Sequence, residues 1–563
     1  MKQHTLCKKL YNHEYVEDIG VGLIFTTFTY KNAGYLKSFD LSFSDGTNHK
    51  GTTIDEFLEV LDDIRYEFNL EKRSDYSKDT FIIYTNDLQK VFGFLMNYDE
   101  HIDIFGQYYF VFRGVFEFRD ISIWFKNLNT SISIAKHAQA LTDDLFMKDK
   151  YFYITPTQSV TKKIKRHCDS DIAKIIYPKD DLEYRSMLKS YFGGICVANV
   201  TGIILDDFIT VEYDRKSAYI YDLLIEKHLC EPLHEESVDN LTYYLENEDK
   251  YLAIITIKIN NIHGIKRVAH YIKNLKGKEI EDGKSCIVTI TNSDFITLQN
   301  MCSILNYTCV KLLVGKKDYL PRYVANVIEE EYAKKVELER LLTLGLATKE
   351  QVKLQKIKVN SIYGATVKKI LSNFTYERDN AYLAPQWGIE TSAFARKNLL
   401  AVALQMKNWL YSDTDSIYCE DCLSNAKIVD EFNNNCEMKI YQYCLENGLD
   451  FNVFKTLGSF QAKTFIKKMK IIGKKTYMYT TTDGDFVLKA SGIVTEYGEE
   501  AYDMDKLPAG KKVLGKLNKN LTSCTIDGVT YTSNGSYYDK NVDCDSIEFL
   551  GELVMTSEII KRR

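Results

Sequence analysis

Two aspartates, Asp413 and Asp415, lie two residues apart in the segment 411–416, between the short apolar runs 409–410 and 417–418. This pattern predicts a hairpin with its turn near Asp413 and Thr414 and both carboxylates on one side of the sheet, because strand residues alternate faces. Two carboxylates held together favour a hard, oxygen-preferring divalent cation such as Mg²⁺. The segment is therefore a candidate metal site.

Chemistry on phosphates with two metal ions needs at least one further carboxylate from elsewhere in the fold. Asp214 is the candidate, because the β-branched and aromatic run 208–213 predicts a strand that ends at this residue. The ordinary alternative for each of the three aspartates is an acid that forms a turn at a strand end.

A helix is predicted downstream of Thr348, which has the capping-box spacing with Gln351. Helical spacing of three and four residues places four side chains along one face of this helix: Lys353, Lys356, Asn360 and Tyr363. Two cations, an amide and an aromatic ring on one stripe suit a triphosphate, a sugar and a base.

At these residues the chain resembles the family B DNA polymerases, and specifically the compact protein-primed group of phages and linear plasmids. The segments similar to the family's motifs A, B and C are 213–219, 356–364 and 411–416. Three shorter elements resemble the Tyr-x-Gly-Gly junction of the exonuclease and polymerase halves, the Lys-x-Tyr element and a primer-side element: 191–194, 475–477 and 489–492. The six elements occur in the family's order, which argues against coincidence.

The resemblance implies a multidomain protein of α+β and α/β architecture: a right-hand polymerase with palm, fingers and thumb, preceded by an exonuclease-like (ribonuclease H-like) α/β domain. The implied division is 1–190 exonuclease-like domain with linker, 191–228 palm with motif A, 229–321 inserted subdomain, 322–367 fingers, 368–382 shortened second insertion, 383–505 palm with motif C, and 506–563 thumb.

The resemblance also implies roles for single residues. Asp214 and Asp413 would hold two Mg²⁺ ions, with Mn²⁺ as an alternative ion, and Asp415 would support the metal site. The implied nucleotide-binding residues are Tyr219 beneath the sugar, Lys356 and more weakly Lys353 at the triphosphate, and Asn360 and Tyr363 at the nascent base pair. The implied DNA-binding residues are Tyr191, Gly193, Gly194, Lys475, Tyr477 and Lys489.

The first 190 residues alternate strand-like runs, such as 22–27 and 81–84, with amphipathic stretches such as 53–61, which is typical of an α/β domain. A 3′-5′ exonuclease on two metals needs a quartet of acids. The family's first exonuclease motif, Asp-x-Glu, falls here on Ile24 and Thr26, neither of which can bind a metal through a carboxylate.

The other exonuclease motifs are degraded too. Asn86 of the second motif is present, but the aspartate that should follow it falls on Lys90 or Val91, with Asp87 a near miss. Asp171 is the best candidate for the third motif. We treat Asn86 and Asp171 as remnants and expect no proofreading, because a lysine beside the site repels metals.

The long segment between motifs A and B has strand and helix patterns of its own, including the run 251–259. In protein-primed relatives an insertion here contacts the terminal protein that primes synthesis; a decorated palm without a priming role is the alternative. The segment between Gly364 and Leu383 is short, so we expect a reduced second insertion and weak strand displacement.

The formal net charge of −6 argues against a protein that simply coats nucleic acid, although the stretches 162–167 and 467–475 are locally basic. No apolar run is long enough to cross a membrane, and the thirteen cysteines lack metal-ligand spacing. We expect a cytoplasmic monomer without membrane contact. Its expected partners are a DNA template and primer, deoxynucleoside triphosphates and, as a candidate primer, a terminal protein.

Two other functions are compatible with parts of the sequence. An RNA-templated polymerase typically has adjacent palm aspartates, whereas Thr414 separates Asp413 from Asp415 and favours a DNA template. The second is a catalytically silent replication or defence factor built on a polymerase fold. The intact acids and Lys356 argue against it.

Overall fold

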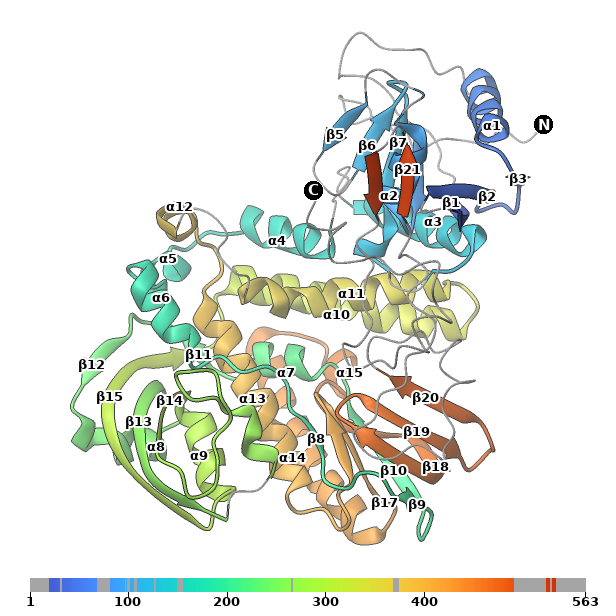
Figure 1. Ribbon diagram of the computed structural model, residues 1–563. Helices are drawn as coiled ribbons and strands as arrows, with labels where there is room; N and C mark the ends of the chain where they lie inside the picture. The colour runs from blue at the N-terminus through green and yellow to red at the C-terminus, as the bar shows by residue number, and fades with distance from the viewer. Residues whose placement is uncertain are drawn as a thin grey trace.

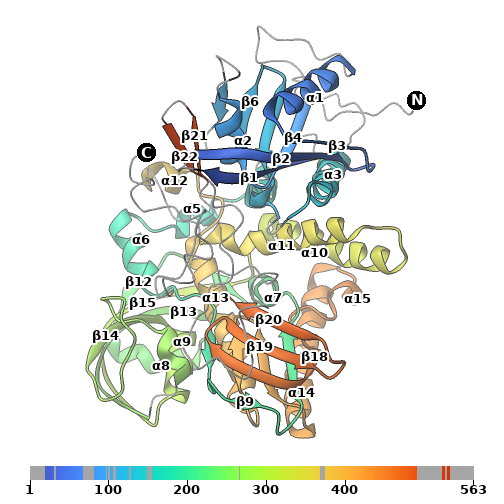
Figure 2. The ribbon, with the colours of Figure 1, turned by 45° about the vertical axis from the view of Figure 1, so that its right-hand side comes forward.

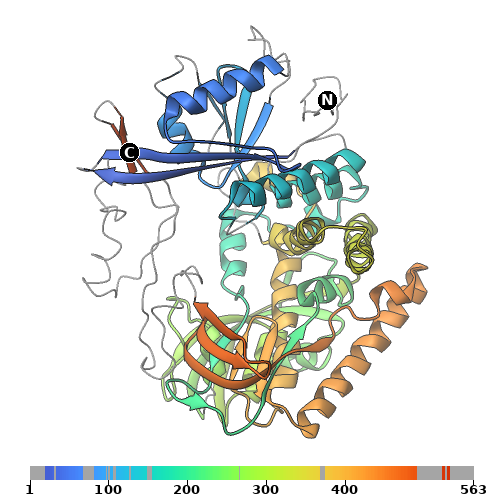
Figure 3. The same ribbon diagram turned by 90° about the vertical axis from the view of Figure 1, so that its right-hand side faces the viewer.

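The computed structural model describes residues 20–30, 33–67, 81–96, 98, 102–105, 109–125, 128–148, 155–264, 267–367, 374–490, 523–526 and 529–532. A long helical hairpin is formed by α10 Arg322–Thr343 and α11 Lys349–Thr366. An N-terminal β-rich domain lies on one side of it, and on the other side lies a second sheet domain with an inserted subdomain (Figure 1). We call this second sheet domain the palm, after the predicted division. In the turned view, α3 of the N-terminal domain lies directly above this hairpin (Figure 3). The hairpin therefore contacts both halves of the molecule.

The N-terminal domain is built on one sheet with the strand order β3-β2-β1-β4-β7-β6-β5. β1 pairs in parallel with β4, and β4 with β7, while the other pairs are antiparallel. The strands are β1 Val21–Tyr30, β2 Ala33–Phe43, β3 Asn48–Gly51, β4 Phe81–Thr85, β5 Asp103–Phe105, β6 Tyr109–Phe112 and β7 Phe116–Asp120. The helices are α1 Ile54–Glu67, α2 Leu88–Leu95 and α3 Ser131–Lys148. The predicted α/β alternation is confirmed.

Three helices connect this domain to the palm: α4 Pro156–Arg166, α5 Ile172–Ile176 and α6 Asp181–Leu188. Thr155 begins α4 by accepting the backbone N–H of Gln158. On α4, the ammonium group of Lys163 contacts the carboxylates of Glu330 and Glu331. Part of the basic stretch 162–167 is thus an ion-paired contact with α10.

The palm sheet has the strand order β20-β19-β18-β10-β17-β16-β8, with β9 beside β18. Its strands are β8 Cys196–Ala198, β9 Ile204–Leu205, β10 Thr210–Arg215, β16 Tyr411–Asp413, β17 Ser416–Glu420, β18 Phe460–Gly473, β19 Thr476–Thr481 and β20 Phe486–Ala490. Its helices are α7 Ala218–Leu224, α13 Pro385–Ala403, α14 Leu423–Asn447 and α15 Phe451–Phe454. In β10, Val211, Tyr213 and Arg215 are buried, which leaves Glu212 and Asp214 on the opposite face.

The inserted subdomain folds around the long strands β13 Tyr251–His263 and β15 Ile304–Asp318, so the strand predicted at 251–259 is confirmed. Its other elements are β11 His228–Leu229, β12 His234–Glu236, β14 Cys286–Thr291, α8 Leu241–Glu246 and α9 Asn292–Asn300. Its apolar core is continuous with that of the palm.

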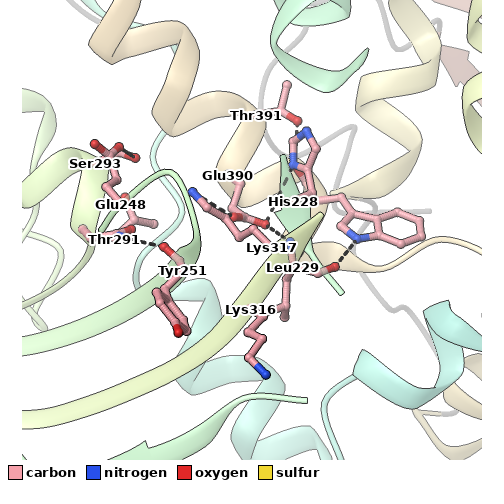
Figure 4. A network of polar contacts seen from close by, with 12 residues as sticks. His228, Leu229, Glu248, Tyr251, Thr291, Ser293, Lys316, Lys317, Glu390 and Thr391 are labelled. Carbon is pink, nitrogen blue, oxygen red and sulfur yellow. Dashed lines mark hydrogen bonds and ion pairs between the residues drawn. The ribbon is translucent and has the colours of Figure 1, made fainter. Parts of the chain in front are cut away.

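A buried polar network joins this subdomain to α13 (Figure 4). Glu390 of α13 accepts the backbone N–H of Leu229 at 2.8 Å. The same carboxylate lies 3.8 Å from His228 Nδ1 and 3.9 Å from Lys317 Nζ. Burial raises the pKa of Glu390 to about 7, and Lys317 opposes that shift. Buried ionisable groups are tolerated only with such partners, so the subdomain is fixed to the palm.

The helix predicted after Thr348 is confirmed as α11 Lys349–Thr366, and with α10 Arg322–Thr343 it forms a helical hairpin in the segment predicted as fingers. Thr348 and Gln351 form the predicted capping box. α11 lies against α3 and α4 (Figure 3). The short helix α12 Phe374–Asp379 follows.

The C-terminal region is described only in the hairpin of β21 Ser523–Ile526 and β22 Val529–Thr532. This hairpin lies beside β2 of the N-terminal domain (Figure 2). The rest of the segment predicted as a thumb, and residues 491–492 of the primer-side element, lie outside the described residues. Within the described part of the chain, no helix is long and apolar enough to cross a membrane.

Candidate active site

The hairpin β16–β17 carries the two motif C aspartates. Asp413 pairs with Ser416, so the turn consists of Thr414 and Asp415, one position later than the sequence predicted. Thr414 has φ 64°, and the Asp415 N–H donates to the Asp413 carbonyl at 2.7 Å, as in a γ-turn. The Thr414 N–H donates to the Ile195 carbonyl at 2.7 Å. A β-branched residue at positive φ is strained and persists only where its surroundings hold it.

The turn determines which acids share a cavity. Asp214 and Asp415 both line a cavity of about 520 Å³, and the Arg215 N–H donates to the Asp415 carbonyl at 2.9 Å. Asp413 lines an adjoining hollow of about 630 Å³, which Asp415 also reaches. The sequence assigned the principal ligand roles to Asp214 and Asp413. In the structure Asp214 shares its cavity with Asp415, and Asp413 lines the adjoining hollow, so the ligand roles of the three acids stay predictions.

The three carboxylates influence one another. Burial raises the pKa of Asp415 to about 6, and the charges of Asp214 and Asp413 contribute to the shift. Lys463 Nζ lies 2.7 Å from Asp214 Oδ1, and Lys475 Nζ lies 3.5 Å from Asp413 Oδ1. Repulsion among the acids is thus balanced by two lysines that the sequence reasoning did not place at the acids.

The donor set suits a hard divalent cation. Asp214 and Asp415 offer carboxylate oxygens to one cavity, which is the ligand chemistry of Mg²⁺. Among the described residues, no three His, Cys, Asp or Glu side chains form a ready-made metal cage. Mg²⁺ commonly takes one or two carboxylates and completes its shell with water and substrate phosphates, so the pair is sufficient for such a site.

One wall of the cavity is aromatic. The rings of Tyr219 and Tyr363 stack with centroids 4.4 Å apart, and the hydroxyls of Tyr363 and Tyr191 lie 3.1 Å apart. Burial raises the pKa of Tyr219 above its usual value, so its hydroxyl is neutral. A Cβ at Gly194 would lie 2.8 Å from Thr414 Cγ2 and 2.9 Å from the Tyr219 hydroxyl. Only glycine fits at this point.

Buried Arg396 of α13 holds the glycine segment in place. Its guanidinium donates to the Gly193 carbonyl at 3.1 Å and to both carboxylate oxygens of Asp294 at 2.9 and 2.7 Å. Asp294 belongs to α9 of the inserted subdomain. The subdomain therefore supports the aromatic wall through a bidentate ion pair.

The lining of the cavity also carries several cations. Lys356 and Asn360 line it from α11, as the helical spacing predicted, and Lys216 and Lys335 also line it. Lys335 Nζ donates to the Ser217 hydroxyl at 2.8 Å. The motif search missed Lys335 because it lies on the other fingers helix, α10, outside any motif.

Lys353 does not line this cavity among the described residues. Its ammonium lies 5.6 Å from the centre of the Phe125 ring in the N-terminal domain. The triphosphate role predicted for Lys353 is therefore not supported by its position. The N-terminal half of α11 faces the other domain, which periodicity alone does not reveal.

The adjoining hollow contains the three residues expected on the primer side, Lys475, Tyr477 and Lys489. The Tyr477 hydroxyl lies 3.1 Å from that of Tyr418. Lys475 adopts φ 57° in the turn between β18 and β19, and its N–H donates to the Tyr411 hydroxyl at 2.9 Å. The hollow therefore adjoins Asp413 and Asp415, and Lys356 is not among the residues that line it.

In the N-terminal domain, the positions of the family's exonuclease motifs are organised differently from the acids of the palm. Lys90 of α2 has a side chain only 10% exposed, and its Nζ lies 3.4 Å from Asp87 Oδ2 and 3.3 Å from the Phe25 carbonyl. Phe25 lies between Ile24 and Thr26, the positions of the missing Asp-x-Glu pair. An ammonium group thus lies beside the place where carboxylates would hold a metal.

Asp87, Asp120 and the two predicted exonuclease remnants form contacts that stabilise the local structure. Asp87 begins α2 by accepting the Lys90 N–H, and Asp120 accepts the Ser122 N–H at 2.8 Å. Asn86 donates to the Leu128 carbonyl at 2.8 Å. Asp171, the other remnant, forms an exposed ion pair with Lys174.

No family model and no curated protein matches the sequence. Solved structures do match the fold. Phi29 DNA polymerase complexed with primer-template DNA aligns with a TM-score of 0.60 at 14% identity, over 88% of this chain and 96% of that one. Phi29 DNA polymerase complexed with single-stranded DNA gives a TM-score of 0.60 at 13% identity, over 92% and 99%. Its ternary complex with primer-template DNA and incoming nucleotides gives 0.56 at 14%, also over 92% and 99%. The chain has the multidomain fold of Phi29 DNA polymerase.

Proposed function

We propose that the protein is a DNA-directed DNA polymerase, which adds deoxynucleotides to a 3′-hydroxyl by phosphoryl transfer. The observation that carries the proposal is the content of one cavity: Asp214 and Asp415, the stacked Tyr219 and Tyr363, and Lys356. Acids, a flat aromatic wall and cations in one cavity suit a metal pair, a nucleoside and a triphosphate. The fold shared with Phi29 DNA polymerase supports the same assignment.

Divalent cations bound at the acids would lower the pKa of the primer hydroxyl and neutralise charge on the phosphates. Asp214 and Asp415 would hold them, and Asp413 would act from the adjoining hollow. Lys356 would contact the triphosphate as a compact charge, joined by Lys335. Lys463 and Lys475 would release the acids when cations enter, because both lysines are about half exposed.

The aromatic wall would select the substrate. The ring of Tyr219 would lie beneath the sugar, where a 2′-hydroxyl would clash, while Tyr363 and Asn360 would shape the base-pair pocket. Lys475, Tyr477 and Lys489 would hold the primer end, and Tyr191, Gly193 and Gly194 would border the template path. Sequence information would come from base pairing with the template.

We also propose that proofreading is lost. The ammonium of Lys90 beside the carbonyl of Phe25 supports this, since a fixed positive charge repels a metal ion. The inserted subdomain and its bond to the palm through Arg396 support a terminal protein as primer. A reaction with single-stranded template, deoxynucleotides and no oligonucleotide separates protein-primed synthesis, which needs that partner, from unprimed synthesis.

A catalytically silent polymerase-fold factor remains the second candidate. One observation favours it: lysines lie against two of the three palm acids, Asp214 and Asp413. Primer extension decides between the two. Purified protein with Mg²⁺, a primed template and deoxynucleotides should extend the primer, and Asp415→Asn should abolish extension. Equal extension by wild type and variant would refute the site, and its complete absence in wild type would favour the silent factor.

A further inference from the structure

Glu339 is a carboxylate that lines the cavity and contacts lysines. It lies one turn beyond Lys335 on α10, with its oxygens 3.6 Å from Lys335 Nζ and 3.8 Å from Lys216 Nζ. It lines the same cavity as Lys356. The carboxylate thus lies among the cations that would contact a triphosphate.

The ammonium groups of Lys216, Lys335 and Lys356 need a negative charge nearby. The side chain of Lys335 is 5% exposed, and its ammonium donates to Ser217 while facing Glu339. Burial lowers the pKa of Lys335, Glu339 opposes that shift, and the charges of Lys216 and Lys356 add to it. A buried ammonium close to two others is costly unless a negative charge lies nearby. Glu339 supplies that charge here.

The carboxylate of Glu339 can also move away from Lys216 and Lys335. Its side chain is 36% exposed, and its contacts with Lys216 and Lys335 are longer than ordinary charge-assisted hydrogen bonds. Ion pairs of this exposure are weak, so a triphosphate with several negative charges would displace the carboxylate toward solvent.

We propose that Glu339 is an internal placeholder for the phosphates of the incoming nucleotide. Its carboxylate holds Lys216 and Lys335 in position in the empty site and competes with the triphosphate for them. This inference rests on the proposed polymerase function for its biological meaning. It makes Glu339 a positioning residue that sets nucleotide affinity without touching the reacting atoms.

The placeholder role predicts tighter nucleotide binding with almost no change in turnover. Glu339→Gln removes the competing charge and keeps the shape, so the KM for deoxynucleotides should fall about threefold to fivefold with kcat nearly unchanged. The gain should shrink as salt rises, because the removed charge is partly exposed. Glu337→Gln is the matched control: Glu337 lies on the same helix and pairs with Arg340, and it does not line the cavity.

A binding measurement separates this inference from the polymerase proposal. Inorganic tripolyphosphate is titrated into metal-free wild type, Glu339→Gln and Glu337→Gln by calorimetry. Tighter binding by Glu339→Gln alone supports the placeholder, and unchanged or weaker binding overturns it. If wild type incorporates no nucleotide, the polymerase proposal fails, and the tripolyphosphate result still decides the role of Glu339.

Discussion

The palm site and the N-terminal domain both place lysines against aspartates, yet the two arrangements differ in whether the lysine can leave. In the palm, Lys463 and Lys475 are 47% and 55% exposed beside Asp214 and Asp413. In the N-terminal domain, Lys90 is 10% exposed beside Asp87. An exposed ion pair contributes only about 0–1 kcal/mol, so a divalent cation displaces it readily, whereas a buried ammonium is a fixed part of the structure. This difference supports the proposals that the palm acids bind divalent cations and that the N-terminal domain has lost its metal site.

The cavity acids give the largest expected effect. Asp214→Asn and Asp415→Asn should each lower primer extension about 10³-fold or more, because each removes a carboxylate from the cavity that both share with Lys356. Single-nucleotide incorporation with Mg²⁺ measures the loss. Asp413→Asn, in the adjoining hollow, is the control and should cost clearly less. A larger loss for Asp413→Asn than for Asp415→Asn would instead support Asp214 and Asp413 as the principal metal ligands, as the sequence alone suggested.

Sugar selection gives the next largest effect. Tyr219→Ala should reduce the preference for deoxynucleotides over ribonucleotides about 10²-fold, because the ring that would block a 2′-hydroxyl is removed. The ratio of kcat/KM values for the two sugars on one template measures it. Tyr219→Phe keeps the ring stacked on Tyr363 and should keep the selection. If both variants retain wild-type selection, Tyr219 is a packing residue only.

Lys90 tests the N-terminal half of the comparison. Lys90→Met should lower the free energy of unfolding by about 1–3 kcal/mol, because Asp87 would be left buried without its cation. Primer extension per folded molecule should stay unchanged, since the cavity is in the palm. Chemical denaturation measures the first and single-nucleotide incorporation the second. Lys50→Met, which removes the 66% exposed partner of Asp40, is the control and should cost less.

The parts of the site that local patterns encode could be predicted from the sequence. The capping box at Thr348 and the helical spacing that follows place Lys356, Asn360 and Tyr363 in the cavity. The same spacing also predicted Lys353 there, but its ammonium lies near Phe125, because helix periodicity does not say which neighbour covers each turn of α11.

The remaining parts depend on long-range structure. Which aspartate faces Asp214 depends on a one-residue shift of the turn, held by the Ile195 carbonyl more than 200 positions away in sequence. Lys335 and Glu339 reach the cavity only through the packing of α10 on α7, and Lys463 only through the pairing of β18 with β10. Lys335, Glu339 and Lys463 lie outside the sequence motifs, so local patterns do not identify them.

For nuclease activity we expect no effect of any variant, because we expect wild type to have none. A labelled single strand incubated with Mg²⁺ and no nucleotides should stay at full length with wild type, and Asp87→Ala should change nothing. Lys90→Asp should also fail to create activity, because Ile24 and Thr26 still supply no carboxylate and two-metal hydrolysis needs several. Mg²⁺-dependent shortening by wild type that Asp87→Ala removes would contradict this prediction. It would show that Lys90 moves away from Asp87 to admit a cation, as we propose for the lysines of the palm.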